Sequence, residues 1–469
     1  MNSGSRRLII KIVRWGLNTR PFAEFQQEGT MGYALILLLV GQEGSVLWSR
    51  TYGGDDYDWF ERVAVDEGGR YIVVGPSWLS GNFDPDLWIL VVDSASGDTV
   101  RSFLIGEPNV FEWPHDILVH DGSYVIAGQK DTLIWAIRVD TSGNVLWENT
   151  YGKGDASAVA LSPDGYYLLG ATVSTDTKSK EFAIVKVDPV DGMLIDSRTY
   201  GTSSWDILVD LAVDEEGNCV ASGATWDGTY ENYLLKFSCT SGDSLWAISF
   251  GDAGSNFATG VVADGDYYAI SSFSTFGLDS SKLVVARVSA ADGSLDWIAE
   301  YTGPEKEESG EGIAVSPAGY YVVVGDYNDG DGIWLLKVNP ENGDTLWSVV
   351  FEDPAGVLSG GVAAGPSGEY VVVGSIEINS TDGLIFKVEG EPPVSMQEHS
   401  AYPIRFEIRH DGVMVFNDTD GQIILKIFDV SGRMVRIIRI ESRSSREIHL
   451  PPGVYMAGWS GGGRVLIVP

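Results

Sequence analysis

The sequence predicts an all-β protein whose main domain is a seven-bladed β-propeller, and three observations support that prediction. The 469 residues include 57 Gly, 15 Trp and 20 Tyr, a composition typical of strands joined by tight turns around much buried aromatic area. A unit of four short strands recurs about every fifty residues. The second and third strands of this unit are almost continuously apolar, so both faces of each sheet must be covered.

Each unit opens with a short apolar strand and a glycine turn, and a second strand follows at once. The first strands read RVAV at Arg62, AVAL at Ala158, DLAV at Asp210, GIAV at Gly312 and GVAA at Gly361. The second strands read YIVVG at Tyr71, YVIAG at Tyr124, YYLLG at Tyr166, CVASG at Cys219, YYAIS at Tyr267, YVVVG at Tyr321 and YVVVG at Tyr370. Four antiparallel strands per unit, each sheet between two neighbours, are typical of a β-propeller.

The third and fourth strands decide how the ring closes. The third strands begin at Asp86, Leu133, Phe182, Tyr233, Leu283, Ile333 and Leu384, and the fourth strands near Asp98, Asn144, Met193, Asp243, Ser294 and Asp344. The last unit therefore runs into EGEPPV without a fourth strand of its own. The early phrase SVLWSRTY, residues 45–52, supplies that strand, and its pairing with Leu384–Val388 removes the open sheet edges.

The two cysteines fall in one unit. Cys219 starts its second strand and Cys239 ends its third, so an antiparallel hairpin centred on residue 229 brings them opposite each other. We predict a disulfide, which indicates an oxidising compartment and an extracellular or cell-surface location. The alternative is two packed free thiols.

Residues 1–44 lie outside the propeller of residues 45–393. They contain the apolar runs RRLIIKIVRW (Arg6–Trp15) and YALILLLVG (Tyr33–Gly41). One reading is a secretory signal, with initiation at Met31 as a variant. The other is a pair of retained strands that pair elsewhere, for example with a neighbouring subunit.

Residues 394–469 form a second domain, where the charge balance changes after the Pro-rich boundary EGEPP. Seven short alternating strands, beginning at Ile404, Gly412, Gln422, Met434, Arg446, Gly453 and Arg464, predict a small Ig-like β-sandwich. The phrases IFDVSGRMV and LPPGVY and the terminal strand resemble the C-terminal sorting domain of the bacterial type IX secretion system. That resemblance implies export, followed by anchoring or assembly.

The propeller units, with the phrases GNVLW and GDTLW, resemble secreted bacterial propellers of the quinoprotein-like repeat type. The resemblance implies the fold. Quinone-dependent dehydrogenases of similar repeat type use a vicinal cysteine pair, which this sequence lacks, so we expect no redox cofactor.

Charge excludes one class of partner. The formal net charge is −35, and residues 45–393 alone carry 17 basic and 55 acidic residues. Such a surface repels phosphate backbones, so nucleic acid is not an expected partner. No run approaches the roughly twenty apolar residues of a membrane-spanning helix.

Catalytic motifs are absent from the sequence. His115 and His120 lack the neighbours of a zinc site, and no G-x-S-x-G elbow or phosphate-binding glycine loop occurs. The Asp-rich pieces GGDDYDW at Gly53 and DYNDGDG at Asp326 offer oxygen ligands for calcium, but the same residues are ordinary turn formers, and we interpret them as turns. We therefore expect no cofactor and no enzyme activity.

The long loops between units carry the candidate binding residues. These are Trp59, Trp78, Trp113, Trp205, Trp226 and Phe257, which either stack on a glycan or anchor a protein partner, or wedge between blades. By contrast, the tryptophans of the fourth strands, such as Trp48, are interpreted as blade core.

The function that follows is a non-catalytic extracellular or cell-surface propeller with a structural or adhesive role. It would assemble with itself through its terminal segments or bind a surface glycan or protein. The alternative is a secreted polysaccharide-active enzyme or glycan-binding module that uses the loop-rich face.

Overall fold

The computed structural model describes residues 10–11, 44–54, 56–78, 84–174, 180–251, 254–275, 281–302, 309–327, 330–365, 368–377 and 380–390, and seven strands between 404 and 468. Contacts divide the chain into two units, Met1–Glu391 and Pro392–Pro469. In the described part of the chain, no helix is long and apolar enough to cross a membrane.

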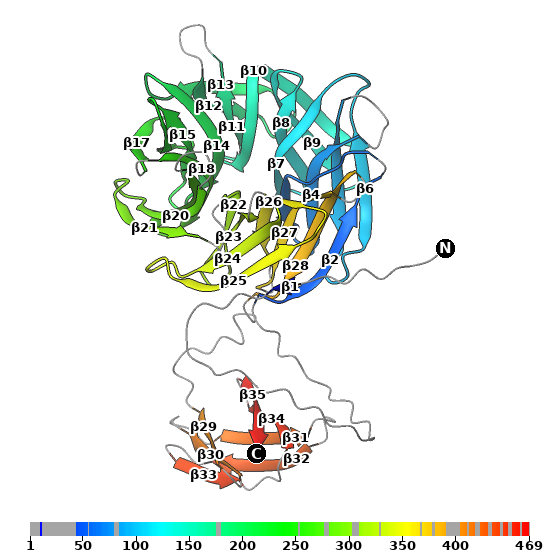
Figure 1. Ribbon diagram of the computed structural model, residues 1–469, viewed down its shortest axis with the longest axis vertical. Coiled ribbons are helices and arrows are strands. Elements are labelled where there is room, and N and C mark those ends of the chain that lie inside the picture. The colour runs from blue at the N-terminus through cyan, green and yellow to red at the C-terminus, as the bar shows by residue number, and fades with distance from the viewer. Residues whose placement is uncertain are drawn as a thin grey trace. The chain divides into compact units, whose positions relative to one another are not determined.

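The first unit is a β-propeller built only of antiparallel sheets (Figure 1). Three of its sheets follow chain order: β3 (Arg62–Val65), β4 (Tyr71–Ser77), β5 (Asp86–Val92), β6 (Thr99–Ile105); β14 (Trp205–Val213), β15 (Asn218–Trp226), β16 (Tyr230–Ser238), β17 (Ser244–Phe250); β18 (Ser255–Asp264), β19 (Tyr267–Thr275), β20 (Ser281–Ser289), β21 (Leu295–Tyr301). Figure 1 shows the sheets as a ring, with the first strands β7, β14, β18, β22 and β26 toward its centre.

Two other sheets of this unit each include a strand from the start of the chain, and the remaining one is a continuous sheet of seven strands. They are β22 (Gly312–Val315), β23 (Tyr321–Tyr327), β24 (Gly332–Val338), β25 (Thr345–Glu352) with β1 (Ile10–Lys11); β26 (Val357–Ala364), β27 (Tyr370–Glu377), β28 (Thr381–Val388) with β2 (Val46–Tyr52); and β7 (Glu112–His120), β8 (Ser123–Lys130), β9 (Leu133–Asp140), β10 (Val145–Leu161), β11 (Tyr167–Val173), β12 (Glu181–Val187), β13 (Leu194–Tyr200).

The early phrase closes the ring. Strand β2 pairs antiparallel with β28, with Trp48 opposite Lys387 and Thr51 opposite Leu384. The prediction that residues 45–52 supply the fourth strand of the last unit is confirmed. Strand β2 therefore covers β28, which would otherwise be an open edge of this sheet.

Burial follows the order of strands within a sheet. Every residue of β4 and of β5 is buried, whereas β6 at the outer edge is mostly exposed. This is the pattern expected where neighbouring sheets cover both faces of the middle strands.

The glycine that ends the second strand is required by a close approach of the first strand. A Cβ on Gly75 would lie 1.8 Å from the carbonyl oxygen of Trp59, and one on Gly374 would lie 2.1 Å from that of Leu358. Any side chain there would collide with backbone, which explains why the phrase YVVVG recurs with its glycine.

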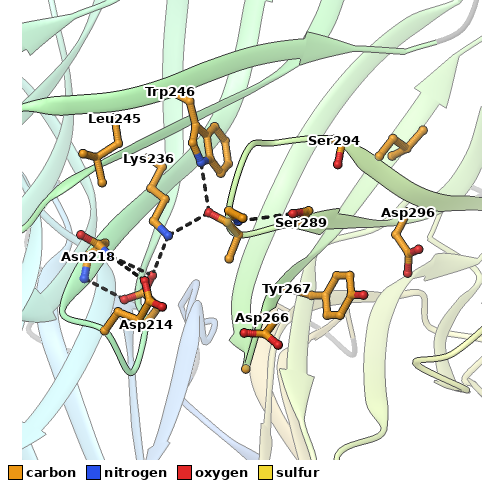
Figure 2. Close-up of a pocket in the computed structure, with 15 residues that line it drawn as sticks. Asp214, Asn218, Lys236, Leu245, Trp246, Asp266, Tyr267, Ser289, Ser294 and Asp296 are labelled. Atoms are coloured by element: carbon orange, nitrogen blue, oxygen red, sulfur yellow. Dashed lines mark hydrogen bonds and ion pairs between the residues drawn. The ribbon is translucent and has the colours of Figure 1, made fainter.

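The tryptophan of the fourth strand packs against the buried core, as predicted, and also connects neighbouring sheets. Trp246 Nε1 donates to the carbonyl oxygen of Ala290 in the next sheet at 3.1 Å, and Lys236 Nζ donates to the same oxygen at 2.9 Å (Figure 2). The Trp246 ring lies 6.0 Å from that of Tyr268. The sequence predicted the packing but not these hydrogen bonds, because a strand's own sequence does not say what the neighbouring sheet presents to it.

The same connection operates where the ring closes. Trp48 Nε1 donates to Ser94 O at 3.2 Å, and the Tyr52 hydroxyl donates to Gly97 O at 2.5 Å. Both acceptors belong to the turn between β5 and β6, so at the ring closure the two aromatic side chains of LWxxxYG bind one sheet to the next.

One pair of predicted strands is a single strand. The sequence predicts a fourth strand from Asn144 and a separate first strand from Ala158, but β10 runs through both. Val145–Thr150 pairs with β9 and Gly154–Leu161 with β11, with register shifts between. The connection is too short to form a loop, so the backbone stays extended from one sheet into the next.

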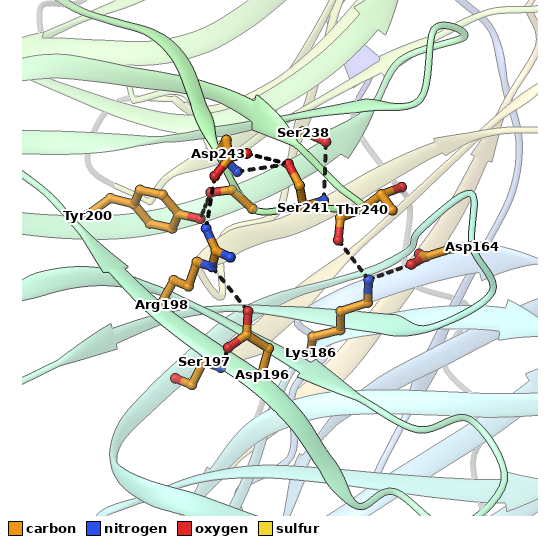
Figure 3. Close-up of polar contacts among 11 residues, drawn as sticks. Asp164, Lys186, Asp196, Ser197, Arg198, Tyr200, Ser238, Thr240, Ser241 and Asp243 are labelled. Carbon is orange, nitrogen blue, oxygen red and sulfur yellow. Dashed lines mark hydrogen bonds and ion pairs between the residues drawn. The ribbon is translucent and has the colours of Figure 1, made fainter.

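Two fourth strands lack this connecting tryptophan. In β6, Arg101 lies opposite Val91. In β13, Asp196 lies opposite Lys186, and the sheet after β13 carries Cys219 where the other sheets carry tyrosine. Arg198 contacts Asp196 at 3.1 Å and Asp243 at 3.2 Å, and Lys186 contacts Asp164 at 2.6 Å (Figure 3). Arg198 and Asp243 thus form an ion pair at an interface that lacks the tryptophan, while Tyr200 packs on Phe237 of the next sheet at 5.6 Å.

Cys219 and Cys239 form a disulfide at this interface, with their Cα atoms 5.2 Å apart. They are not directly opposite, as the expected hairpin centre had placed them: Cys219 faces Phe237, and Cys239 follows the end of β16. The turn is centred one residue earlier than expected, so the bridge is diagonal.

The N-terminal segment contributes one strand to the ring. Strand β1 pairs with β25, with Ile10 opposite Phe351 and Lys11 opposite Val350. The run Tyr33–Gly41 and the candidate start Met31 lie outside the described residues.

The second unit contains seven strands in two antiparallel sheets. One sheet has the order β29 (Ile404–Arg409), β30 (Gly412–Asn417), β33 (Ser444–Ile448), and the other β32 (Met434–Ile440), β31 (Ile423–Asp429), β34 (Gly453–Trp459), β35 (Gly462–Val468). All seven strands lie in the segments where alternating apolar residues predict them.

Candidate functional site

Three of the six candidate aromatic residues form one cluster. The ring centroids of Trp59 and Trp113 lie 4.8 Å apart, and Trp78 lies 5.7 Å from Trp59 and 6.2 Å from Trp113. Phe111 stacks on Trp113 at 5.2 Å. Glu61 accepts hydrogen bonds from the indoles of Trp59 at 2.9 Å and Trp113 at 3.1 Å. These rings are half-buried and pack against one another.

The other three candidates belong to a row of aromatic side chains on β14, β15, β16, β18 and β19. Trp205 faces Trp226, and Trp226 faces Tyr230 across the strands, so the three share one face of the sheet. Phe257 continues the row, 5.6 Å from Tyr230 and 5.7 Å from Phe273. We call these five residues the aromatic row.

The two groups differ in accessibility. Trp205 is 43% exposed and Trp226 is 41% exposed, with ring centroids 5.9 Å apart. Phe257 is half-buried against its neighbours. The six candidates therefore do not form one site, and the open aromatic surface is the tryptophan pair.

Sequence reasoning missed a set of polar residues on the first strands. Arg62, Asp116 and Asp210 stand directly before the apolar triplets VAV, ILV and LAV, where other units carry Gly or Ala. A charged residue in the two positions before the triplet is the sequence signal that could have identified these residues. Arg62 Nη1 donates to the carbonyl oxygens of Glu61 at 3.1 Å and Gly360 at 3.3 Å.

The two aspartates link neighbouring first strands. Asp116 Oδ1 accepts the Ile117 N–H and Oδ2 accepts the Val159 N–H, both at 2.8 Å. Asp210 makes the same pair of contacts with Leu211 and Val261, also at 2.8 Å. Each carboxylate thus replaces ladder hydrogen bonds that the β-bulge beside it removes.

The surroundings of the buried carboxyl groups on or beside the first strands raise their pKa values. Burial is the main cause that raises the pKa of Asp116 to about 7, and the charge of Asp210 adds to it, while Arg62 opposes. Burial likewise raises the pKa of Asp210. For Glu311, burial and then the charge of Asp326 raise the pKa to about 7.

The two histidines of the propeller have separate partners. His115 Nε2 lies 3.1 Å from Asp155 Oδ1; burial opposes the charged ring, but this carboxylate outweighs it and raises the pKa of His115. His120 Nδ1 lies 2.9 Å from the Tyr167 hydroxyl. Across the described ranges, no group of three or more His, Cys, Asp or Glu side chains could hold a metal ion.

The Asp-rich turns use their carboxylates internally. Asp58 accepts the Gly54 N–H at 3.0 Å and the Ser77 hydroxyl at 2.5 Å. Asp326 accepts the Ser359 N–H at 2.6 Å and its hydroxyl at 2.8 Å. Both residues therefore act in the turn and between strands.

No family model and no curated protein matches the sequence. Among solved structures, the chain is similar to the hydrazine synthase of Kuenenia stuttgartiensis, with a TM-score of 0.49 and 15% identity over 75% of this chain and 98% of that chain. It is also similar to the Dos1 propeller, with a TM-score of 0.45 and 11% identity over 78% of this chain and 93% of that chain. The activity named for the first is not transferred to this chain at such identity.

Proposed function

We propose that this protein is a non-catalytic, extracellular or cell-surface binding propeller, and that it captures a surface glycan on the aromatic row. The observation that carries the proposal is the exposed pair Trp205 and Trp226. Large aromatic rings with accessible faces stack on the apolar faces of sugar rings, and nearby polar groups satisfy the hydroxyls.

Polar side chains flank the pair. Asp227 is exposed directly after Trp226, and Glu231 follows Tyr230 in β16, also exposed. A buried network beneath the pair, in which Thr202 N donates to Asp206 Oδ2 at 2.7 Å, holds the loop that leads into β14. The rings thus stand on ordered backbone, which lowers the entropy lost on binding.

The proposal includes the finer architecture. A ring of seven blades follows if β10 counts as the fourth strand of one blade and the first of the next. The two sheets of the second unit support an Ig-like sandwich, used for type IX export and anchoring. The β1 pairing supports a retained N-terminal strand, through which copies would assemble at the cell surface.

The second candidate function is a secreted polysaccharide-active enzyme. The raised pKa values of Asp116 and Glu311, both about 7, favour it, since a general acid must keep its proton near neutral pH. Against it, each oxygen of Asp116 already accepts a backbone hydrogen bond, which supports a structural role for this carboxyl group.

The test compares two double variants of the full chain on a panel of immobilised polysaccharides. Trp205→Ala with Trp226→Ala should abolish retention and leave the melting temperature nearly unchanged, because both rings are exposed. Trp59→Ala with Trp113→Ala is the matched control: it should lower the melting temperature and leave retention unchanged.

Two results contradict the proposal. Retention that survives the loss of Trp205 and Trp226 would exclude the aromatic row as the binding surface. Release of reducing ends from a retained polysaccharide, lost in Asp116→Asn, would favour the enzyme.

A further inference from the structure

A hollow of about 830 Å³ lies between the sheet β14–β17 and the sheet β18–β21, among the tight turns of the ring (Figure 2). The size falls within the range of small-molecule sites. The hollow is lined by turn residues and by the first residues of β17 and β21, and contains none of the aromatic row.

The hollow is open because one hairpin is short. Strands β18 and β19 are joined by only Gly265 and Asp266, with Asp264 paired to Tyr267. The corresponding turn of the preceding sheet runs from Asp214 to Asn218. A Cβ on Gly265 would meet nothing within 4 Å, so the space beside this turn is free.

The charges on the inner wall of the hollow form an ion pair and neutralise each other. Lys236 Nζ lies 3.1 Å from Asp214 Oδ2 and donates to Ala290 O at 2.9 Å, and the Tyr268 hydroxyl donates to Asp214 Oδ2 at 2.7 Å. Lys236 and Asp214 are buried. The one lysine of the lining therefore offers no free charge to an anion.

The rim carries excess negative charge. Glu216 and Asp266 are exposed, and Asp296 lies at 3.5 Å from Arg287, whose other carboxylate neighbour is Asp264 at 3.7 Å. One arginine thus faces two carboxylates, while Glu216 and Asp266 add two more charges. The rim attracts a cation.

The remaining wall is apolar and aromatic. Leu245 is 52% exposed and Leu295 46% exposed, and Trp246 and Tyr267 complete it. The Arg287 guanidinium lies over the Tyr267 ring, 3.6 Å from its centroid, a cation–π contact within the wall.

The rim carboxylates do not converge. No cluster suited to a metal ion exists here or elsewhere in the described part of the chain. Carboxylates spread around an apolar wall instead match a ligand whose positive charges are separated by methylene groups. We infer that the hollow binds a linear polyamine, independently of the function proposed for the aromatic row.

Calorimetric titration of the full chain with spermidine tests this inference. Glu216→Gln with Asp266→Asn should weaken binding about tenfold, because two rim charges are lost. Glu215→Gln with Asp292→Asn is the matched control, since it removes two exposed charges from the same sheets outside the lining; it should change affinity less than about twofold. Spectra of fluorotryptophan-labelled protein, assigned with Trp246→Phe, should show the Trp246 signal moving.

Equal weakening in both double variants would overturn the inference, since it would indicate diffuse attraction to an acidic surface. A Trp246 signal that stays in place while spermidine binds would also overturn it, as would no measurable binding at low salt. Trp205→Ala with Trp226→Ala should leave the spermidine titration unchanged, so failure of the glycan proposal and failure of this one are distinguishable.

Discussion

Removal of the disulfide is predicted to destabilise the propeller measurably. Cys219 and Cys239 are 20 residues apart in sequence, and the cross-link restricts the unfolded chain over that loop. For a loop of this length the restriction contributes about 3 kcal/mol. Cys219→Ala with Cys239→Ala should lower the free energy of unfolding by about that amount.

The assay is guanidinium unfolding followed by tryptophan fluorescence. The double variant should show a lower midpoint, with a slope no smaller than that of the wild type, because its unfolded chain is no longer cross-linked. Wild-type protein in reductant is the control: Cys219 is 0% and Cys239 2% exposed, so the folded state should keep its disulfide and its initial fluorescence. A midpoint identical to that of the wild type in the double variant would refute the reasoning.

Three further perturbations test other parts of the account. Trp147→Phe should cost about 1 kcal/mol, because it removes the Nε1 hydrogen bond at 3.1 Å to Pro189 O, in the turn between β12 and β13, and this acceptor keeps an arginine donor; an unchanged unfolding midpoint would contradict this. Gly75→Ala should cost about 3 kcal/mol, while Gly312→Ala, whose Cβ would meet its nearest neighbour at 3.6 Å, should be tolerated in the same thermal melts. Glu311 keeps its proton in the folded state up to about pH 7 but loses it near pH 4.5 when unfolded, so its contribution favours folding at pH 5 and is lost by pH 8. Glu311→Gln should therefore reduce the stability difference between pH 5 and pH 8; an undiminished difference would exclude this carboxyl as its source.

Most of the fold could be predicted from the repeat pattern. Apolar strands that return with YVVVG and LWxxxYG place the second, third and fourth strands, and the missing last strand predicts the β2 pairing. The strands are marked by local sequence patterns, and the ring closure follows from the number of strands in each unit, so both can be predicted without coordinates.

What escapes sequence reasoning depends on neighbouring sheets. Trp48 packs against the core, as predicted, but its hydrogen bond to Ser94 becomes apparent only when the turn of the next sheet is placed beside it. Asp116 and Asp210 stand in variable positions of the repeat, and only the register shift at each bulge reveals that they bind the next strand. The aromatic residues predicted in loops look alike in sequence, yet Trp59, in the segment before β3, packs inward, while Trp205, at the start of β14, remains open.

Amide hydrogen exchange of residues 46–52 tests the central claim, closure of the ring by an early strand, most directly. If β2 is the outer strand of the sheet β26–β28, this peptide should exchange as slowly as β17, which occupies the same place in another sheet. Exchange of residues 46–52 at the rate of an unpaired segment, with β17 still protected, would contradict the account.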